Sequence, residues 1–333
     1  MLDKIPSDEA VGGTPALPGD DPQQALRVRA AWIYYVEGRT QNEVAQILGL
    51  SRVAVTRLLA DAKRRREVSI SVTADLAELV ALERTLEARY TLKRAIVAPF
   101  CAGGDPTRVV AAAAGAHVSA LLGSAATVGV GWGRTLYEML AYLEPRPLPD
   151  MQVISFLGGI SEAKRFNPAE FAWRFAELFD AEGFLVPAPA IVDSRETRHA
   201  LVEHCGLDQI FQRAEACDMA LLSCAGISSL TTSYRIGHVS EAERLALIEA
   251  GAVGDILYNF IDRDGDVVRH PVNERAMSVS LKRLRRIKDR ILISGGPEKV
   301  DIMRATLKSV EPTTLITDEQ TAKALAAGEC VTL

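Results

Sequence analysis

Apolar residues follow a helical period near the N-terminus of the chain and form short strand-like runs further on. Between Thr40 and Arg66, two apolar stripes flank a glycine; the first contains Val44, Ala45 and Leu48, and the second contains Val55, Leu58, Leu59 and Ala62. Apolar positions three and four residues apart predict two short amphipathic helices. Because the two stripes can pack against each other, this stretch predicts a helix-turn-helix.

The turn between the stripes has the residues that this motif needs. Counted from Gln41, the fifth residue is Ala45, which allows close helix crossing, and the ninth is Gly49, where the turn needs a positive φ. The fifteenth is Val55, which faces the helix pair, and Ser51 is predicted to cap the second helix. A glycine turn alone also occurs in ordinary helical hairpins, but the coincidence of these constraints favours a DNA-reading unit.

Polar side chains mark the outer face of the second predicted helix. Arginine and hydroxyl side chains suit contacts with base edges and phosphates in a major groove. A basic run, Lys63 to Arg66, follows; such runs are often only solvated faces. Residues 21 to 73, however, carry nine basic and five acidic side chains, a net of +4, whereas the whole chain has a net charge of −5. We predict that DNA is bound by Gln41, Ser51, Arg52, Thr56 and Arg57.

The segments around this motif complete a small domain, predicted for residues 21–73. Residues 1–20 are rich in Gly, Pro, Asp and Ala and predict a disordered tail, and residues 22–38 predict a supporting helix. Trp32 and Tyr35 in that helix could stack on bases, but filling the core or edge of the helix pack is the favoured interpretation. The alternating stretch from Glu67 to Thr73 predicts a strand or wing.

The rest of the chain predicts a linker helix at residues 74–91 and an effector domain at residues 92–333. Short apolar runs alternate there with helical stretches, at Ala95–Ala98, Thr127–Val130, Gln152–Phe156, Met219–Ser223, Ile256–Ile261, Ile291–Ser294 and Thr314–Thr317. This alternation predicts an α/β fold, an open and mostly parallel Rossmann-like sheet with helices on both faces. Ligands of such sheets bind beyond the carboxyl ends of the strands.

Glycines follow four of the predicted strands. The stretch VGVGWGRTL, residues 128–136, passes from a strand into a helix, where backbone N–H groups with Arg134 and Thr135 could hold a phosphate. It is neither a Walker loop nor a dinucleotide fingerprint. The others are LGG at 157–159, AGISS at 225–229 and SGGPEK at 294–299. Because glycine is common in such turns, one would mean little, but four predict a single cleft lined by backbone.

Two charged residues also lie near predicted strand ends. The Asp255 carboxylate could accept hydrogen bonds from sugar hydroxyls, and Lys299 could bind phosphate. Asp255 could instead cap a turn, and Lys299 could be an ordinary surface residue. We predict an effector site made of Gly133, Arg134, Thr135, Gly158, Ser228, Asp255 and Lys299, with no metal, cofactor or catalytic residue.

From about Leu26 onward the chain carries a series of motifs in a fixed order, YYVEG with TQ, LGLSRVAVTRLL, VGVGWGRTL, GAVGDIL, HPVNERAMSVSL, ISGGPEKVDIMRATL and TTLITDEQTAKALAAG. In these motifs and their order it resembles the SorC family of bacterial sugar-responsive transcription regulators. Two stretches depart from the family: KRRREVSI lacks the usual glycine before the strand, and SCAGISSL replaces a plain GIG turn.

The resemblance implies an effector domain similar to the ribose-5-phosphate and glucosamine-6-phosphate isomerase fold, behind the N-terminal helix-turn-helix. It also implies a tetramer whose DNA affinity changes with a phosphorylated sugar. By the same resemblance, the effector cleft contains Arg134, Thr135, Ser228, Asp255 and Lys299.

These observations predict a DNA-binding transcriptional regulator controlled by a small sugar or polyol, or a phosphate of either, and acting as a homo-oligomer, a dimer or a tetramer. The alternative is a sugar-phosphate isomerase that carries a DNA-binding domain. Its base would be Asp255, Asp262, Asp264 or Asp318, but the sequence pairs none of them with a partner group. The absence of a signal peptide, of a long apolar run and of paired cysteine motifs predicts a cytoplasmic protein without membrane contact.

Overall fold

The computed structural model describes residues 22–68, 77–99, 104–160, 167–228 and 239–327. It divides into two compact units, Met1–Ala74 and Asp75–Leu333. The predicted tail lies outside the described residues, as does most of the predicted wing strand from Glu67 to Thr73.

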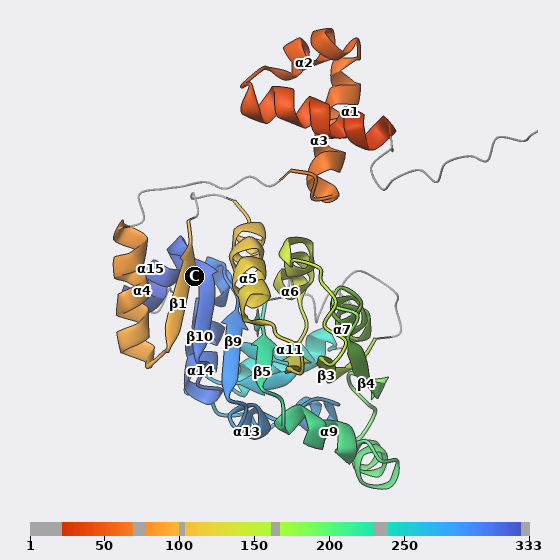
Figure 1. Ribbon diagram of the computed structural model, residues 1–333. Coiled ribbons are helices and arrows are strands. Elements are labelled where there is room, and N and C mark those ends of the chain that lie inside the picture. Colours follow the sequence, from red (N-terminus) through yellow and green to blue (C-terminus); the bar gives the residue numbers. More distant parts are fainter. Residues whose placement is uncertain (1–21, 69–76, 100–103, 161–166, 229–238, 328–333) are drawn as a thin grey trace, which may run out of the picture. The chain divides into compact units, whose positions relative to one another are not determined.

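The first unit consists of helices. They are α1 (Pro22–Ala31), the π-helix η1 (Trp32–Val36), α2 (Gln41–Leu48) and α3 (Arg52–Arg64) (Figure 1). The predicted stripes face inward, where Val44, Val55 and Leu59 pack with Ala30 and Ile33 in one core cluster. Packing of the apolar stripes of these helices against one another therefore stabilises the unit, as the helical period indicated.

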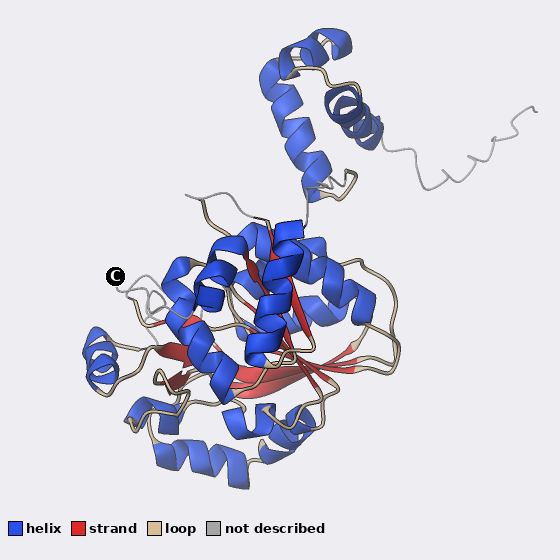
Figure 2. Ribbon diagram, turned by 90° about the vertical axis from the view of Figure 1, so that its left-hand side faces the viewer, coloured by secondary structure: helices blue, strands red, loops and turns tan. Residues whose placement is uncertain are grey.

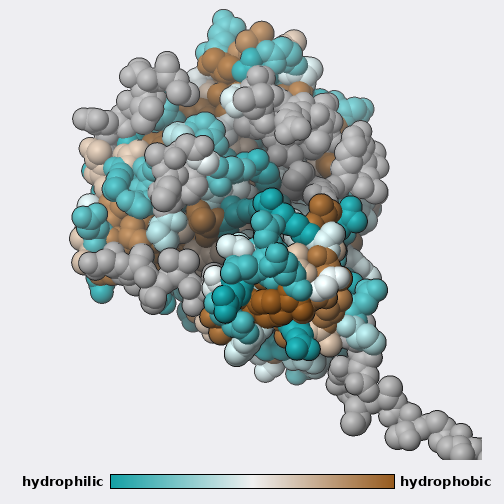
Figure 3. Space-filling view, turned by 90° about the horizontal axis from the view of Figure 1, so that it is seen from above, coloured by the Kyte–Doolittle hydropathy of each residue, from teal (hydrophilic) through white to brown (hydrophobic). Residues whose placement is uncertain are grey.

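Trp32 does not fill this core. The residue is 59% exposed and lies outside the core cluster, so the core-filling part of the interpretation is wrong for Trp32, while helix-edge packing stays a prediction. Tyr35 is half-buried against the core cluster, and the Lys63 ammonium lies 5.3 Å from its ring centre. Exposed apolar side chains also include Val28, Val36 and Ile47. A space-filling view shows an apolar area bordered by hydrophilic residues (Figure 3).

The second unit is built on a seven-stranded sheet with the order β1-β10-β9-β5-β2-β3-β4. Its strands are β1 (Arg94–Ala98), β2 (Thr127–Val130), β3 (Gln152–Gly159), β4 (Glu182–Pro189), β5 (Met219–Leu222), β9 (Asp289–Ile293) and β10 (Thr314–Asp318). All neighbouring strands are parallel. The prediction of an open parallel α/β sheet is confirmed.

Helices cover both faces of the sheet (Figure 2). Apolar side chains on one face pack with α5 (Thr107–Leu121), α6 (Arg134–Met139) and α7 (Pro168–Glu177). The other face packs with α4 (Ala77–Tyr90), α9 (Asp208–Glu215), α11 (Glu241–Glu249), α13 (Leu281–Leu284), α14 (Val300–Ser309) and α15 (Glu319–Ala327). Shorter elements are η2 (Leu140–Tyr142), α8 (Arg195–His199), η3 (Ala200–His204), α12 (Pro271–Arg275) and η4 (Pro297–Lys299). Successive side chains of a strand point alternately into the hydrophobic cores on the two faces of the sheet. Because both faces are buried, the strands read as continuous apolar runs.

The predicted linker helix, α4, is part of the second unit. Its Leu86 is fully buried, and its Glu87 and Glu83 accept hydrogen bonds from Ala95 N and Val97 N of β1 at 3.0 and 2.9 Å. These contacts fix α4 to the edge of the sheet.

Two strand predictions were wrong. Strand β4 was missed because its sequence contains Pro187 and Pro189; at the edge of a sheet, prolines are tolerated. The run Ile256–Ile261 is not one strand but a hairpin of β7 (Gly254–Ile256) and β8 (Asn259–Ile261), paired antiparallel and joined to β6 (Ala225–Gly226). Its turn residues Leu257 and Tyr258 have φ values of 55° and 58°, as a tight hairpin turn requires.

Candidate functional site

Helix α3 is held by local caps and a tight turn. Gly49 adopts φ 66° at the end of α2, and Ser51 Oγ accepts a hydrogen bond from Ala54 N at 3.2 Å at the start of α3. Thr40 and Glu43 form a reciprocal capping box at the start of α2. These bonds fix both helix starts, so the angle between α2 and α3 is set by residues near the turn.

The outer face of α3 presents the predicted DNA-binding residues. Ser51, Arg52, Thr56 and Arg57 are exposed, and Gln41 is half-buried. The Thr56 hydroxyl lies 3.1 Å from Gln41 Oε1, to which it can donate, and 3.0 Å from the Arg52 carbonyl. This contact brings the start of α2 against α3.

The two arginines of this face have no recorded ion pair among the residues that the structure describes. The neighbouring Arg64, by contrast, pairs with Asp61 at 2.7 Å. An unpaired guanidinium can exchange water for a phosphate or a guanine edge without first breaking an internal bond. The arrangement of Arg52 and Arg57 therefore suits contact with a nucleic-acid groove.

In the second unit, the order in which the chain adds strands to the sheet changes direction between β2 and β5. Strands β3 and β4 follow β2 on one side, and β9 and β10 follow β5 on the other. The carboxyl ends of parallel strands diverge at such a point and leave a crevice for a ligand. Gly131 bridges the two strands here, donating its N–H to the Leu221 carbonyl at 2.8 Å.

Beyond this point lie Gly133 and the start of α6. Gly133 has φ 130°, and a Cβ there would lie 3.8 Å from the Ser223 side chain that follows β5. Arg134 is exposed and Thr135 is buried. Helix α6 has only six residues before it becomes a 3-10 turn, so its dipole is short and the charged side chains must supply most of the attraction for an anion.

Arg134 pairs with an acid that the sequence analysis did not identify. Its guanidinium lies 3.2 and 3.3 Å from the two carboxylate oxygens of Asp105. Asp105 also accepts hydrogen bonds from the N–H and hydroxyl of Thr107, at 3.0 and 2.6 Å. Burial raises the Asp105 pKa, but the Thr107 hydrogen bonds and the charges of Arg134 and Lys299 outweigh it, so the pKa lies below its ordinary value. Asp105, Arg134 and Lys299 thus share one electrostatic neighbourhood.

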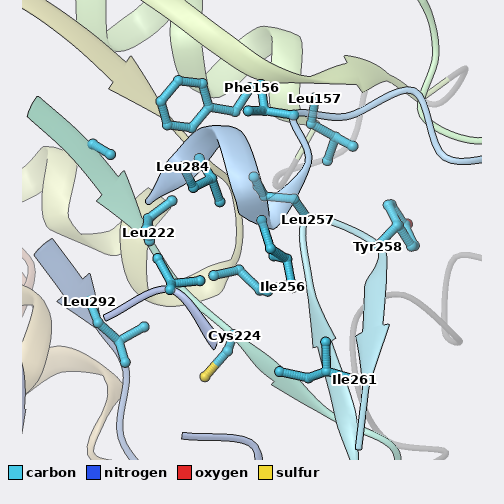
Figure 4. Packing of buried hydrophobic residues seen from close by; sticks show 14 of the residues in the cluster. Phe156, Leu157, Leu222, Cys224, Ile256, Leu257, Tyr258, Ile261, Leu284 and Leu292 are labelled. Carbon is cyan, nitrogen blue, oxygen red and sulfur yellow. The ribbon is translucent and has the colours of Figure 1, made fainter. Parts of the chain in front are cut away.

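Lys299 and Asp255 both act on Cys224, which follows β5. Burial is the main cause of the raised Cys224 pKa; the hydrogen bond with Ser294 and the charge of Lys299 oppose it, and the charge of Asp255 adds to it. Figure 4 shows Cys224 beside Leu222 and Ile256, at the boundary between the main sheet and the hairpin. Asp255 pairs with Ala225, the residue after Cys224, and a Cβ at Gly226 would lie 3.0 Å from the Glu298 carbonyl oxygen. Asp255 and Lys299, 44 positions apart in the chain, therefore both lie near the end of β5.

Asp255 also supports the hairpin turn. It is 2% exposed, and its Oδ2 accepts a hydrogen bond from Tyr258 N at 2.9 Å. The Tyr258 ring stacks on Trp132 with 5.3 Å between centres. This bond stabilises the left-handed turn, so Asp255 has the turn-capping role that the sequence left open as an alternative.

Gly158 has a packing role in the sheet. Gly158 N donates to the Met277 carbonyl at 2.9 Å, and a Cβ at Gly158 would lie 2.5 Å from the Ala188 carbonyl oxygen. Close packing of β3 on β4 thus explains this glycine. Ser228 is exposed just beyond β6.

Three acids proposed as bases for an isomerase have structural partners. Asp318 accepts hydrogen bonds from Gly296 N at 2.9 Å and from the Thr321 hydroxyl at 2.6 Å, and so fixes the loop that carries Lys299. Asp262 accepts two backbone N–H groups of the turn after β8, and Asp264 pairs with Lys308 at 3.0 Å. Within the described ranges, no cluster of His, Cys, Asp and Glu is suited to a metal ion, and no helix has the length and apolarity to span a membrane.

Comparison with known proteins finds a family model described as "Putative sugar-binding domain", which matches residues 74–327. The deoxyribonucleoside regulator of Bacillus subtilis is 29% identical over 309 residues, covering 92% of this chain and 98% of that protein. The erythritol catabolism regulatory protein of Brucella abortus is also 29% identical, covering 92% and 97%. The crystal structure of the full-length sorbitol operon regulator SorC from Klebsiella pneumoniae matches with a TM-score of 0.68 and 24% identity, over 91% of this chain and 99% of that one.

The family match extends from the helix α4 to the helix α15 and includes every strand of the sheet. These two relatives are named as regulators, and further relatives from Escherichia coli and an Enterobacter species are named as transcriptional regulators. The resemblance to SorC proteins is therefore confirmed, and the chain belongs to the family of regulators that carry this sugar-binding domain.

Proposed function

We propose that this protein is a transcriptional regulator in which α3 reads operator DNA and a small ligand at the β2–β5 crevice sets the operator affinity. The observation that carries the proposal is the combination, in one chain, of a capped helix-turn-helix with exposed arginines and a sugar-binding domain whose crevice gathers Arg134 and Lys299.

The DNA half of the proposal concerns Arg52 and Arg57. If either contacts a base, its replacement by alanine should cost about 1–3 kcal/mol of operator binding and relax sequence discrimination. The test is a mobility-shift titration of Arg52→Ala and Arg57→Ala, with Arg84→Ala as the control because Arg84 is an exposed arginine of the second unit. Unchanged operator affinity in both variants would refute α3 as the reading helix.

The effector half concerns the crevice. Relatives named for deoxyribonucleosides, erythritol and sorbitol support a small polyhydroxylated ligand, and the guanidinium and ammonium groups of the crevice favour its phosphate. The proposed contacts are Gly133, Arg134, Thr135 and Lys299, with Ser228 still a prediction; Asp255 caps the hairpin turn and Gly158 packs closely against β4, so their structural roles explain them.

A thermal-shift panel of free and phosphorylated sugars and polyols identifies the ligand, because a molecule that binds only the folded state raises the apparent stability. Lys299→Ala should then weaken ligand binding and leave ligand-free operator binding nearly intact. Lys282→Ala, at an exposed lysine of α13, is the matched control. Thr135→Val removes a hydroxyl while keeping the side-chain shape. Wild-type ligand affinity in both Lys299→Ala and Thr135→Val would mean that the pocket lies elsewhere.

Two further parts of the proposal concern assembly and location. A single reading helix per chain contacts too few base pairs for useful specificity, so we expect a homo-oligomer, a dimer or a tetramer, acting in the cytoplasm. Light scattering that detects only monomer, free and on operator DNA, would contradict the assembly. Turnover of any sugar phosphate in the same panel would favour the isomerase instead.

A further inference from the structure

The first unit carries a shallow apolar groove that its own core does not use. The groove has a volume of about 430 Å³ and is lined by Ala25, Val28, Arg29, Trp32, Ile33, Glu37 and Ile47. We call it the α1 groove. Val28 is 41% exposed, Trp32 59% and Ile47 56%. Contiguous exposed side chains of this size mark an interaction surface more often than isolated ones do.

The helix that forms the groove is apolar on two sides. Ala30, Ala31 and Ile33 face inward and are buried in the core of the unit. Ala25, Val28, Trp32 and Val36 are exposed and recur at intervals of three or four residues along the same helix. A surface helix needs only one apolar stripe to fold onto its unit, so the second stripe is available for a partner helix.

Charged residues of opposite sign flank the tryptophan. Arg29 precedes Trp32 by three positions and Glu37 follows it by five, and both line the groove. No ion pair is recorded for either among the residues that the structure describes. A second copy of the helix running antiparallel across a two-fold axis would place Arg29 of each copy against Glu37 of the other, with the two Trp32 side chains near the axis. Such an arrangement is self-complementary, as a two-fold interface must be.

We propose that the α1 groove is the contact through which the DNA-reading units of two copies of this chain pair. This goes beyond the proposed function, which leaves the oligomer contact unassigned. Trp32 supplies the buried anchor, a role for which tryptophan is favoured in interfaces, and the two Arg29–Glu37 pairs set the antiparallel direction. The pairing fixes the spacing of two α3 helices, and hence the spacing of the half-sites that they read.

The first test is photo-cross-linking of the full-length chain without DNA, with p-benzoylphenylalanine in place of Trp32 so that an aromatic anchor of similar size is kept. Irradiation should join position 32 of one copy to residues of the α1 groove of another copy, as mapped by mass spectrometry. The same residue in place of Ala60 is the control, because Ala60 is exposed on α3 outside the groove. A yield of groove links no higher than the yield from position 60 would overturn the proposal. So would a link that forms only after deletion of residues 1–20, because the chain's own N-terminal segment would then be the occupant.

The second test reverses the charges in the same photo-cross-linkable chain, which keeps an aromatic group at position 32. Arg29→Glu and Glu37→Arg should each lower the yield of groove links several-fold, because each single reversal places two pairs of like charges together. The double reversal should restore the yield, since it recreates both pairs with exchanged signs. A double variant no better than the single variants would overturn the pairing. Because neither test uses operator DNA or effector, failure of the proposed reading or sensing function leaves both tests intact.

Discussion

The ion pair between Arg27 and Glu67 connects α1 with the segment after α3. Its side chains are only 6% and 9% exposed. Arg27 Nε lies 3.1 and 2.8 Å from the two carboxylate oxygens of Glu67, and Nη2 lies 2.6 Å from Oε1. We predict that Arg27→Met unfolds the DNA-reading unit and leaves the effector unit folded.

The magnitude follows from the burial of the pair. Removing one partner of a buried ion pair costs about 3–5 kcal/mol, because the remaining charge stays desolvated without compensation. A unit of about fifty ordered residues has a total stability of roughly 2–8 kcal/mol at the usual value per residue. The loss is therefore comparable with the whole stability of the unit, whose core cluster contains eight buried apolar residues among residues 22–68.

Amide hydrogen exchange of the full chain measures this prediction segment by segment. In Arg27→Met, peptides from α2 and α3 should lose protection while peptides from β2 and β5 keep it, and operator binding should disappear. Arg64→Met is the matched control: its partner is Asp61, the two side chains are 73% and 39% exposed, and such a pair is worth less than about 1 kcal/mol.

A double variant separates charge burial from packing. Arg27→Met with Glu67→Leu removes both charges and should recover most of the protection, because an apolar pair of similar volume can replace a buried ion pair. If Arg27→Met showed the same exchange as Arg64→Met, the ion pair would not stabilise the unit and the reasoning would be refuted.

Three further predictions concern the effector unit. Gly129→Ala would place a methyl group 1.8 Å from the Phe156 ring; overpacking of this kind costs about 1–3 kcal/mol, and an unchanged melting temperature would contradict it. Burial is the main cause of the lowered His117 pKa, so the unfolded chain binds the proton first and stability should fall as pH drops below about 6.5; urea titrations of His117→Gln should show a weaker pH dependence. Burial raises the Cys217 pKa to about 12, so iodoacetamide at pH 8 should label the exposed Cys205 and leave Cys217 unmodified.

The helix-turn-helix was predictable because its determinants are close together in the sequence. The Thr40–Glu43 capping box, the positive φ of Gly49 and the Ser51 cap lie within twelve residues. Each of these features acts on backbone groups of its own turn. The local sequence is therefore sufficient to predict the local conformation. The core position predicted for Trp32 was wrong. The helical period shows that a helix carries an apolar stripe, but it does not show which side of the helix faces the core.

The hairpin at Leu257 and Tyr258 was not predictable on these grounds. Two bulky residues with positive φ contradict local preference. They are held by the Asp255 hydrogen bond and by stacking of Tyr258 on Trp132, which is more than a hundred residues earlier in the chain. The conformation is set by tertiary contacts, which the sequence pattern does not contain.

The pairing of Asp105 with Arg134 depends on topology in the same way. Asp105 precedes α5, which follows β1, and three strands separate β1 from β2 in the sheet. Only the crossing of α5 from one strand to the other brings the aspartate to the start of α6. Glycines at strand ends predict a ligand site at the carboxyl edge of the sheet, but the order of the strands decides which side chains meet there.

The charge balance of this crevice constrains how a ligand could act. A carboxylate, that of Asp105, already contacts Arg134 and is attracted by Lys299 in the structure. In the proposed site, an anionic effector gains the full Arg134 contact only by displacing Asp105, whereas a neutral polyol can bind without doing so. A ligand shifts a conformational equilibrium only by the difference between its affinities for the two conformations. Displacement of Asp105 from Arg134 by a ligand phosphate would produce such a difference. Because Asp105 also accepts two hydrogen bonds from Thr107, the first residue of α5, the displacement would act on a helix that packs across β1, β10 and β9 and would be transmitted beyond the ligand site.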